Sequence, residues 1–269
     1  MENLIITVAP TGNRLRKAKH PLVPISPEEI SEDLYECWKA GASVAHVHAR
    51  DKEENPTSAP DVYEAVWSRL KKARCGIVRQ ASLAGKATTD RRLLDILDTD
   101  AEMASLGMGS INYLDRVNLF EPDFIAELAE KMKNKGIKPE LEIFDVSMTD
   151  NALRLKDKGL LEEPLKYNFI LDGPGTLKGT VDNLLFMVNR LPKEALWGVS
   201  AMGPSHVALT AMAVVMGGHV RVGLEDRPFD GGGKPMSNVE QVRWVVGLSE
   251  KLGRKVADSD EARRILGLN

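Results

Sequence analysis

The chain is poor in cysteine, with Cys37 and Cys75 as its two thiols in 269 residues. Two thiols in a chain of this length do not make the disulfide framework that stabilises many secreted domains. Both lie in segments with the pattern of ordinary secondary structure. This cysteine usage fits a reducing cytosol, so the sequence predicts a cytoplasmic protein.

Long apolar runs and basic stripes are also missing. No window reaches the ~20 apolar residues of a membrane span, and residues 1–7 lack the cationic region and apolar run of a secretory leader. The formal net charge is −3, and we find no stripe of Lys and Arg of the kind that nucleic-acid binding requires. We therefore expect no membrane and no nucleic-acid partner, and a small molecule as the ligand.

What is present is the composition of a soluble globular protein, with 43% hydrophobic and 28% charged residues. Short apolar, β-branched runs alternate with longer segments of helical periodicity. The predicted strands cover residues 4–9, 43–50, 76–82, 103–110, 138–145, 167–172, 196–201 and 219–226. The predicted helices begin near residues 26 and 89 and cover 59–73, 121–136, 149–158, 181–190, 205–216 and 239–252.

Eight strand-then-helix units without a break in composition predict a single (β/α)8 TIM barrel over residues 1–269, a fold that typically takes roughly 250 residues. A doubly wound open sheet is the alternative, but its first turn is commonly GxGxxG, and this chain has Ala9-Pro10-Thr11-Gly12. The active sites of barrel enzymes lie at the C-terminal ends of the strands, and in this chain the predicted strands end in polar residues. They include Thr11, Ser82, Ser105, Glu142, Asp145, Asp172 and Ser200.

Two histidines stand two residues apart in the predicted strand 43–50. Because side chains alternate along a strand, His46 and His48 point to one face. Two neutral imidazoles on one strand can converge on one metal ion. For this pair alone, half-buried histidines that hydrogen-bond to their neighbours are an equal alternative.

The same alternation in the predicted strand 219–226 places Arg221, Gly223 and Glu225 toward the barrel interior, and Val220, Val222 and Leu224 toward the helices. Two imidazoles and a carboxylate, with one position open, are a ligand set typical of catalytic zinc. A simple pairing of Glu225 with Arg221 is the alternative for that carboxylate alone. Taken together, the three side chains favour a metal site.

Several pieces of the chain resemble a known family. They are Thr11-Gly12, Pro24-Ile25-Ser26-Pro27-Glu28-Glu29-Ile30, Ala40-Gly41-Ala42, His46-x-His48-x-Arg50-Asp51, Met103-Ala104-Ser105-Leu106, Pro139-Glu140-Leu141-Glu142 and the ten residues of 217–226. The chain resembles the β-keto acid cleavage enzyme family over nearly its whole length. The resemblance implies a zinc-dependent barrel, usually a homotetramer, that reacts a β-keto acid with acetyl-CoA to give acetoacetate and a new acyl-CoA.

The resemblance also implies roles for single residues. It makes His46, His48 and Glu225 the zinc ligands, Asp226 the general base and Arg221 its associated arginine, and Ser82 a contact of the substrate carboxylate; Ser105 and Glu142 match further active-site positions. In this chemistry the metal acts as a Lewis acid on the 3-keto oxygen, so that a carboxylate can remove a proton from C2 and the enolate can attack the thioester. CoA then moves to the old keto carbon, and a retro-Claisen cleavage releases acetoacetate.

Two positions depart from a family member whose substrate carries an ammonium group. Where that member has an acid after Thr-Gly, this chain has Asn13 and Arg14, and where it has an asparagine, this chain has Gly107. An arginine would repel an ammonium group, so we expect a neutral or anionic β-keto acid. The alternative for Arg14 is a side chain that points to solvent. Residues 14–21 form a long basic loop that is a candidate lid or anion contact.

Other classes stay open from the residues alone. Metal-dependent hydrolases with HxH on a barrel need further histidines, and this chain has none between residues 49 and 205. An aldolase-type lyase and a non-catalytic metal-binding barrel also remain as alternatives.

Three further features of the sequence have two interpretations or an open geometry. His206 could join the site or be structural. The glycine turn 231–233 before Lys234 could approach CoA phosphates, although a surface turn is the stronger interpretation. Arg221 and Asp226 would be about 16 Å apart on an extended strand, so their association requires the chain to curl.

Overall fold

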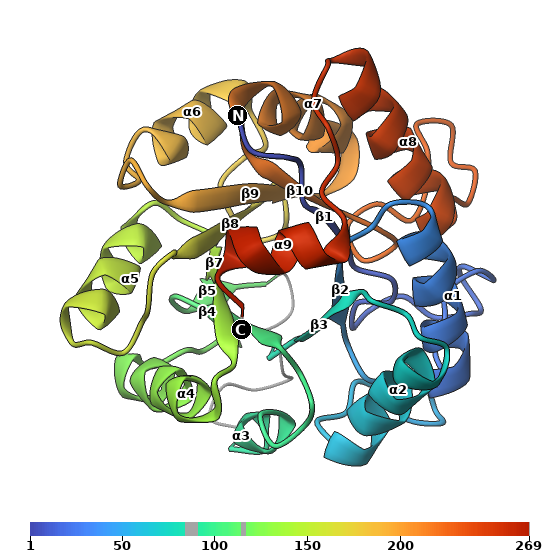
Figure 1. The fold of residues 1–269 in the computed structure, drawn as a ribbon, viewed down its shortest axis with the longest axis horizontal. Coiled ribbons are helices and arrows are strands. Elements are labelled where there is room, and N and C mark those ends of the chain that lie inside the picture. The colour runs from blue at the N-terminus through green and yellow to red at the C-terminus, as the bar shows by residue number, and fades with distance from the viewer. Residues whose placement is uncertain (84–90, 114–116, 269) are drawn as a thin grey trace.

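The structure is a computed structural model that describes residues 1–83, 91–113 and 117–268. Eight parallel strands close into a barrel in the order β1-β10-β9-β8-β7-β4-β3-β2, and Figure 1 shows the helices arranged around it. The predicted (β/α)8 barrel is therefore confirmed. The barrel strands are β1 (Ile6–Val8), β2 (Val44–Val47), β3 (Val78–Ala81), β4 (Met103–Gly107), β7 (Lys138–Ile143), β8 (Lys166–Leu171), β9 (Leu196–Ala201) and β10 (His219–Val222).

The helices follow the strands along the chain. They are α1 (Pro27–Lys39), α2 (Pro60–Lys72), α3 (Leu93–Ile96), α4 (Pro122–Lys135), α5 (Ser147–Asp157), α6 (Val181–Val188), α7 (His206–Met216), α8 (Asn238–Lys251) and α9 (Ser259–Leu266). The predicted start of the third helix, near residue 89, lies outside the described residues. Within the described parts of the chain, no helix combines the length and the hydropathy needed to cross a membrane.

Helix α1 begins where its sequence predicts. The Ser26 hydroxyl accepts a hydrogen bond from the Glu29 backbone N–H at 3.2 Å, and the Glu29 carboxylate accepts one from the Ser26 backbone N–H at 3.0 Å. This capping box satisfies two backbone donors that a helix otherwise leaves unpaired, and Pro27 takes the first helical position, where no N–H is needed.

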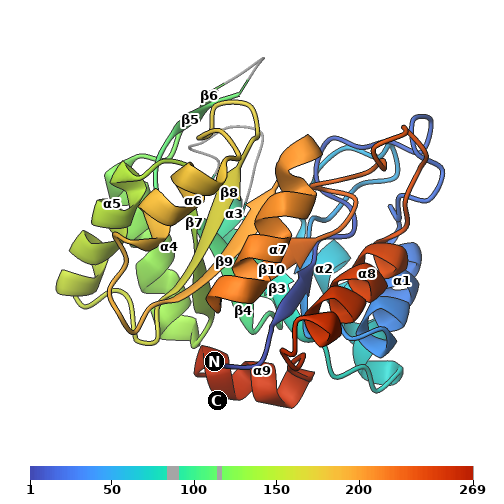
Figure 2. The same cartoon turned by 90° about the horizontal axis from the view of Figure 1, so that it is seen from above.

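A hairpin of two short strands and one helix were not predicted. The first is a short antiparallel pair, β5 (Ile111–Asn112) and β6 (Val117–Asn118), which rises beside the barrel mouth in Figure 2. The second is α9, which crosses the opposite end of the barrel in Figures 1 and 2. Ala262 and Leu266 of α9 belong to one buried cluster with inward-facing residues near the start of the strands, namely Ile5, Val44, Val78 and Met103. Helix α9 thus covers the N-terminal end of the barrel and leaves the C-terminal end as the mouth.

The predicted last strand is too long, because β10 ends at Val222. Gly223 has φ +135°, and a Cβ there would lie 2.3 Å from the Ala9 carbonyl oxygen. The backbone N–H groups of Asp226 and Arg227 donate to the Gly223 carbonyl at 3.2 and 2.9 Å, which closes a turn. The chain therefore curls before Glu225, and strand alternation does not extend to that residue. Leu224 is also not on the helix side as predicted, since it packs in a small cluster with Val23 and Ile25.

We expect Gly223→Ala to lower the free energy of unfolding by on the order of 3 kcal/mol, because it adds strain at positive φ to a clash with backbone. Urea denaturation of the two proteins measures this difference. The control is Gly247→Ala within α8, where a Cβ meets nothing within 4 Å and alanine favours the helix. Equal stability of Gly223→Ala and wild type would show that the turn tolerates a side chain.

Candidate active site at the barrel mouth

Three side chains meet at the mouth. His46 lies on β2, His48 follows its last residue, and Glu225 comes from the turn after β10. One ligand atom of each lies within 4.8 Å of the others, and the imidazole centroids are 5.2 Å apart. Nε2 of His48 is 3.3 Å from both Glu225 carboxylate oxygens, and Nε2 of His46 is 3.8 Å from Oε2. The structure thus brings together the three predicted ligands, and their metal-binding role stays a prediction.

The chemistry of this donor set fits a metal ion. Nε2 of His46 and Oε2 of Glu225 are buried and have no hydrogen-bond partner in the described structure, which is unusual for buried polar atoms. Burial lowers the pKa of His46 to about 3, so its ring is neutral and can donate a lone pair. These atoms are those that a divalent ion would satisfy.

Gln80 on β3 holds the His46 ring from behind. Its Oε1 lies 2.7 Å from Nδ1 of His46, and the side chain is fully buried. This contact places the proton on Nδ1 and leaves Nε2 directed toward Glu225. We did not single out Gln80 from the sequence, although alternation along 76–82 places it on the same face as Ser82.

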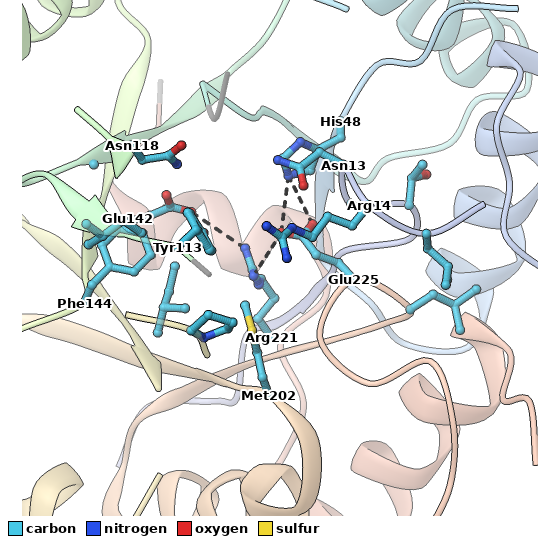
Figure 3. A pocket seen from close by; sticks show the side chains of 18 of the residues that line it. Asn13, Arg14, His48, Tyr113, Asn118, Glu142, Phe144, Met202, Arg221 and Glu225 are labelled. Carbon is cyan, nitrogen blue, oxygen red and sulfur yellow. Dashed lines mark hydrogen bonds and ion pairs between the residues drawn. The ribbon is translucent and has the colours of Figure 1, made fainter. Parts of the chain in front are cut away.

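A buried arginine joins the carboxylates. Arg221 donates from Nε and Nη2 to the two oxygens of Asp226 at 2.9 and 2.7 Å, and from Nη2 to Glu225 at 3.2 Å. Its Nη1 lies 3.7 Å from Glu142 on β7. Figure 3 shows this chain of contacts from His48 through Glu225 and Arg221 to Glu142. The curl after Val222 makes the Arg221–Asp226 contact possible.

The electrostatics differ among the three carboxylates. Burial raises the pKa of Glu142 to about 8. Burial also raises the pKa of Asp226, to about 6, against the effect of Arg221 and with the help of the Glu225 charge. For Glu225, burial is outweighed by Arg221 and the two histidines, so its pKa lies well below the usual value. At neutral pH, Glu225 is ionised, Asp226 is an anion of raised basicity, and Glu142 holds a proton.

A cavity of about 310 Å³ opens at this cluster. Five of the eight predicted substrate-binding and catalytic residues line it, namely Thr11, Arg14, Gly107, Glu142 and Arg221. Asp226, Ser82 and Ser105 are buried and not among the residues that line it; the Ser105 hydroxyl accepts a hydrogen bond from the Leu83 N–H at 3.1 Å. The structure thus gathers five of these eight residues around one cavity, and Asp226 contacts one of the five, Arg221.

The lining also includes residues that the sequence did not indicate. Tyr113, Asn118 and Phe120 come from the hairpin β5–β6 and the residues beside it. Two-residue strands give too short a pattern to recognise, so no sequence signal pointed to them.

Two further candidates for the site, His206 and the glycine turn 231–233, are not among the residues that line the cavity. His206 is buried with Nδ1 2.8 Å from the Ala201 carbonyl, and the glycine turn 231–233 is held by Asp230, which accepts from the Gly232 and Lys234 N–H groups.

The basic loop between β1 and α1 forms one wall. Asn13, Arg14, Leu15 and Lys19 line the cavity. Arg50, which is buried, fixes this loop by donating to the Gly12 carbonyl at 2.7 Å and to the Leu15 carbonyl at 3.2 Å. The arginine of the HxHxR motif therefore ties the loop to the segment that carries the two histidines.

Fold and cavity define a (β/α)8 barrel with a polar site at the C-terminal ends of its strands, which is where barrel enzymes have their active sites. The family model for beta-keto acid cleavage enzymes matches residues 3–268. The chain belongs to this family, and it is an enzyme of β-keto acid cleavage.

Two curated relatives cover almost the whole chain. The 3-keto-5-aminohexanoate cleavage enzyme of Acetoanaerobium sticklandii is 38% identical over 272 residues and covers 100% of both chains. The 3-oxoadipate:acetyl-CoA acetyltransferase of Cupriavidus necator is 35% identical, over 98% of this chain and 94% of its own. Among solved structures, a binary complex of ObcA with oxaloacetate has a TM-score of 0.81 at 21% identity, covering 93% of this chain and 68% of that one. This last likeness supports the fold alone.

In the metal-free protein we expect Glu142 to contribute a loss of stability as the pH rises from 5 to 8, whereas buried His46, which is neutral in the native state, contributes in the opposite direction as the pH rises toward 6.5. The native state keeps the Glu142 proton up to about pH 8, whereas a glutamate in the unfolded chain has a pKa of 4.5, so this group binds less proton in the unfolded state across the range. For this one group, the free energy of unfolding changes by at most about 1.4 kcal/mol per pH unit. Urea denaturation at four pH values in the presence of a chelator measures it.

Glu142→Gln removes this titrating group, so the stability of wild type relative to the variant is expected to fall as the pH rises from 5 to 8. The control is Glu130→Gln at an exposed position of α4, which is expected to follow the wild-type curve. Parallel curves for Glu142→Gln and wild type would contradict a protonated Glu142.

Proposed function

We propose that the protein is a zinc-dependent enzyme that reacts a β-keto acid with acetyl-CoA to give acetoacetate and a new acyl-CoA, with a neutral or anionic rather than an amino-substituted substrate. The observation that carries this proposal is the meeting of His46, His48 and Glu225 directly beside the Arg221–Asp226 pair. The names of relatives support acetyl-CoA as the second substrate, since one is a 3-oxoadipate:acetyl-CoA acetyltransferase.

His46, His48 and Glu225 would hold the zinc ion, which when bound supplies a Lewis acid for the 3-keto oxygen. Asp226 would remove the proton from C2. Its raised pKa makes it a stronger base than an ordinary aspartate, and the contact with Arg221 fixes its direction. The C2 carbanion would attack the acetyl carbonyl and form the new C–C bond, with CoA as the leaving group.

In the second half of the proposed reaction, the CoA thiolate attacks the 3-keto carbon of the original β-keto acid, and the bond between that carbon and C2 breaks. The electron pair of this bond stays on C2 of the acetoacetate unit, which then takes up a proton. Glu142, which lies beside Arg221 and carries a proton at neutral pH, is our candidate for a proton donor in the cavity. Acetoacetate and the new acyl-CoA then account for all atoms of the two substrates.

Substrate binding would involve Ser82 for the carboxylate at C1, with Ser105, Gly107 and Thr11 shaping the site and Arg14 near the far end of the substrate. Ser105 supports Leu83, a residue of the cavity lining, through its hydroxyl. Gly107 leaves room in front of Phe120, since a Cβ there would lie 3.2 Å from the ring.

We further propose a cytoplasmic homo-oligomer, a tetramer by family resemblance. The free thiols of Cys37 and Cys75 support a reducing compartment. Exposed apolar side chains on the neighbouring helices α6 and α7 support association between copies, namely Val181, Phe186, Val207 and Val215.

Asp226→Asn is expected to lower the rate of acetoacetate formation by about 10²- to 10⁴-fold, because the base is removed. The zinc content should stay that of wild type, because the three ligands remain. Acetoacetate release from a panel of β-keto acids and acetyl-CoA, with metal analysis on the same samples, measures both. Unchanged turnover would remove Asp226 from the mechanism. Zinc binding without turnover by the wild-type protein would favour the non-catalytic binding barrel.

Gln80→Leu is expected to weaken zinc binding by about 10- to 100-fold, because the His46 ring loses the acceptor that orients it. Competition with a chromophoric chelator measures the affinity. Gln80→Glu keeps an oxygen acceptor and serves as the matched control, with an affinity equal to or above that of wild type. Circular dichroism of both variants separates this effect from loss of fold. Equal affinities in all three proteins would contradict a role for Gln80.

A further inference from the structure

Two buried amide side chains at the start of α8 face the turn that carries Glu225. Asn238 is the first residue of this helix and Gln241 follows one turn later, so the two amides lie on one side of it. Neither side chain is exposed to solvent. The capping box formed by Ser237 and Glu240 fixes where the helix begins, and it thereby fixes the position of both amides.

The Asn238 amide joins three segments of the chain. Its Oδ1 accepts a hydrogen bond from the Leu224 N–H at 2.8 Å, and its Nδ2 donates to the Pro10 carbonyl at 3.2 Å and to the Asp33 carboxylate at 2.7 Å. Leu224 directly precedes Glu225, and Pro10 stands just beyond the end of β1. One side chain therefore connects the turn after β10 with β1 and with α1, which lies beside α8 in Figures 1 and 2.

The partners of Asn238 allow one orientation of its amide. The Pro10 carbonyl and the Asp33 carboxylate accept hydrogen bonds, whereas the Leu224 N–H donates one. A reversed amide would set its oxygen against two acceptors and its nitrogen against a donor. Nδ2 therefore faces β1 and α1, and Oδ1 faces the turn.

Gln241 holds the same turn at both of its ends. Its Oε1 accepts from the Gly223 N–H at 3.1 Å, and its Nε2 donates to the Arg227 carbonyl at 3.0 Å. The two carboxylates that the proposed mechanism uses stand between these two residues. The backbone of the turn is thus held by side chains of α8 that do not line the cavity.

We infer that Asn238 is a positioning residue for the metal ligand Glu225: its amide fixes the backbone at Leu224, so that the next carboxylate faces the two imidazoles of β2. The inference rests on the proposed function, which assigns the zinc ion to this site. Nε2 of His48 is 3.3 Å from both oxygens of Glu225, and such a ligand set holds an ion only while its atoms converge. Arg221 contacts the carboxylates themselves, whereas Asn238 acts on the backbone that carries them.

Asn238→Leu tests this role, because leucine has a similar size and forms none of the three hydrogen bonds. We expect zinc to bind about 10- to 100-fold more weakly, measured by competition with a chromophoric chelator. Amide hydrogen exchange of the metal-free protein is the second readout. Residues 223–227 should exchange at least about tenfold faster than in wild type, with β2 unchanged. Circular dichroism verifies the fold.

Ser249→Ala is the matched control. It removes a buried hydroxyl in the last turn of the same helix, where Ser249 donates to the Arg254 carbonyl at 2.6 Å. We expect this variant to keep the zinc affinity and the exchange of residues 223–227 of wild type, since the start of α8 and its two amides are unchanged.

An exchange of partners tests the hydrogen bonds themselves. The double variant Asp33→Asn/Asn238→Asp returns an acceptor to the Leu224 N–H and a donor between α1 and α8, and it should recover most of the zinc affinity that Asn238→Leu loses. Asn238→Asp alone should bind zinc more weakly than the double variant, because two like charges then face each other. The comparison is made at pH 8, above the value of about 7 to which burial raises the pKa of Asp33.

Three results would overturn the inference. They are wild-type zinc affinity and exchange in Asn238→Leu, an equal loss of zinc affinity in Ser249→Ala, and a double variant that binds zinc no better than Asn238→Leu. If wild type itself binds no zinc, the proposed reaction fails. In that case faster exchange of residues 223–227 in Asn238→Leu still supports the positioning of the turn, and unchanged exchange refutes it.

Discussion

The arrangement of the barrel mouth depends on the buried charge of Arg221. A guanidinium removed from water needs anions close to it, and an unpaired buried charge costs several kcal/mol. Arg221 is 2% exposed and contacts Asp226, Glu225 and Glu142. These contacts require the chain to fold back after β10, and they direct Glu225 toward the imidazoles of β2. One cation therefore positions carboxylates from two parts of the chain, β7 and the turn after β10.

The turn that allows this contact is set by backbone geometry. Gly223 adopts a positive φ against the Ala9 carbonyl, and the side chains of Gln241 and Asn238 accept hydrogen bonds from the N–H groups of Gly223 and Leu224. Helix α8 thus holds the turn from outside while Arg221 holds it from inside. The position of Glu225 is fixed by both, before any ligand binds.

Much of the fold could be predicted because the strands and helices of a barrel have clear periods. Alternation along 43–50 placed His46 and His48 on one face, and Gln80 could have been found in the same way. Glu225 was placed correctly for a wrong reason, since the strand ends at Val222 and only the turn brings the carboxylate inward. The hairpin that carries Asn118 could not be predicted, and neither could the cation–π contact of Arg14 with Tyr113, 5.2 Å from the guanidinium carbon to the ring centroid. Both depend on loops that meet only in the folded protein.

Helix α9 closes the N-terminal end of the barrel. The cluster of Ala262 and Leu266 with the strand starts fills that end of the interior, while the reactive cluster lies at the opposite rim. A ligand that reaches His48 and Glu225 must therefore enter from the side of the β1–α1 loop and the hairpin, because the described residues fill the interior at its other end.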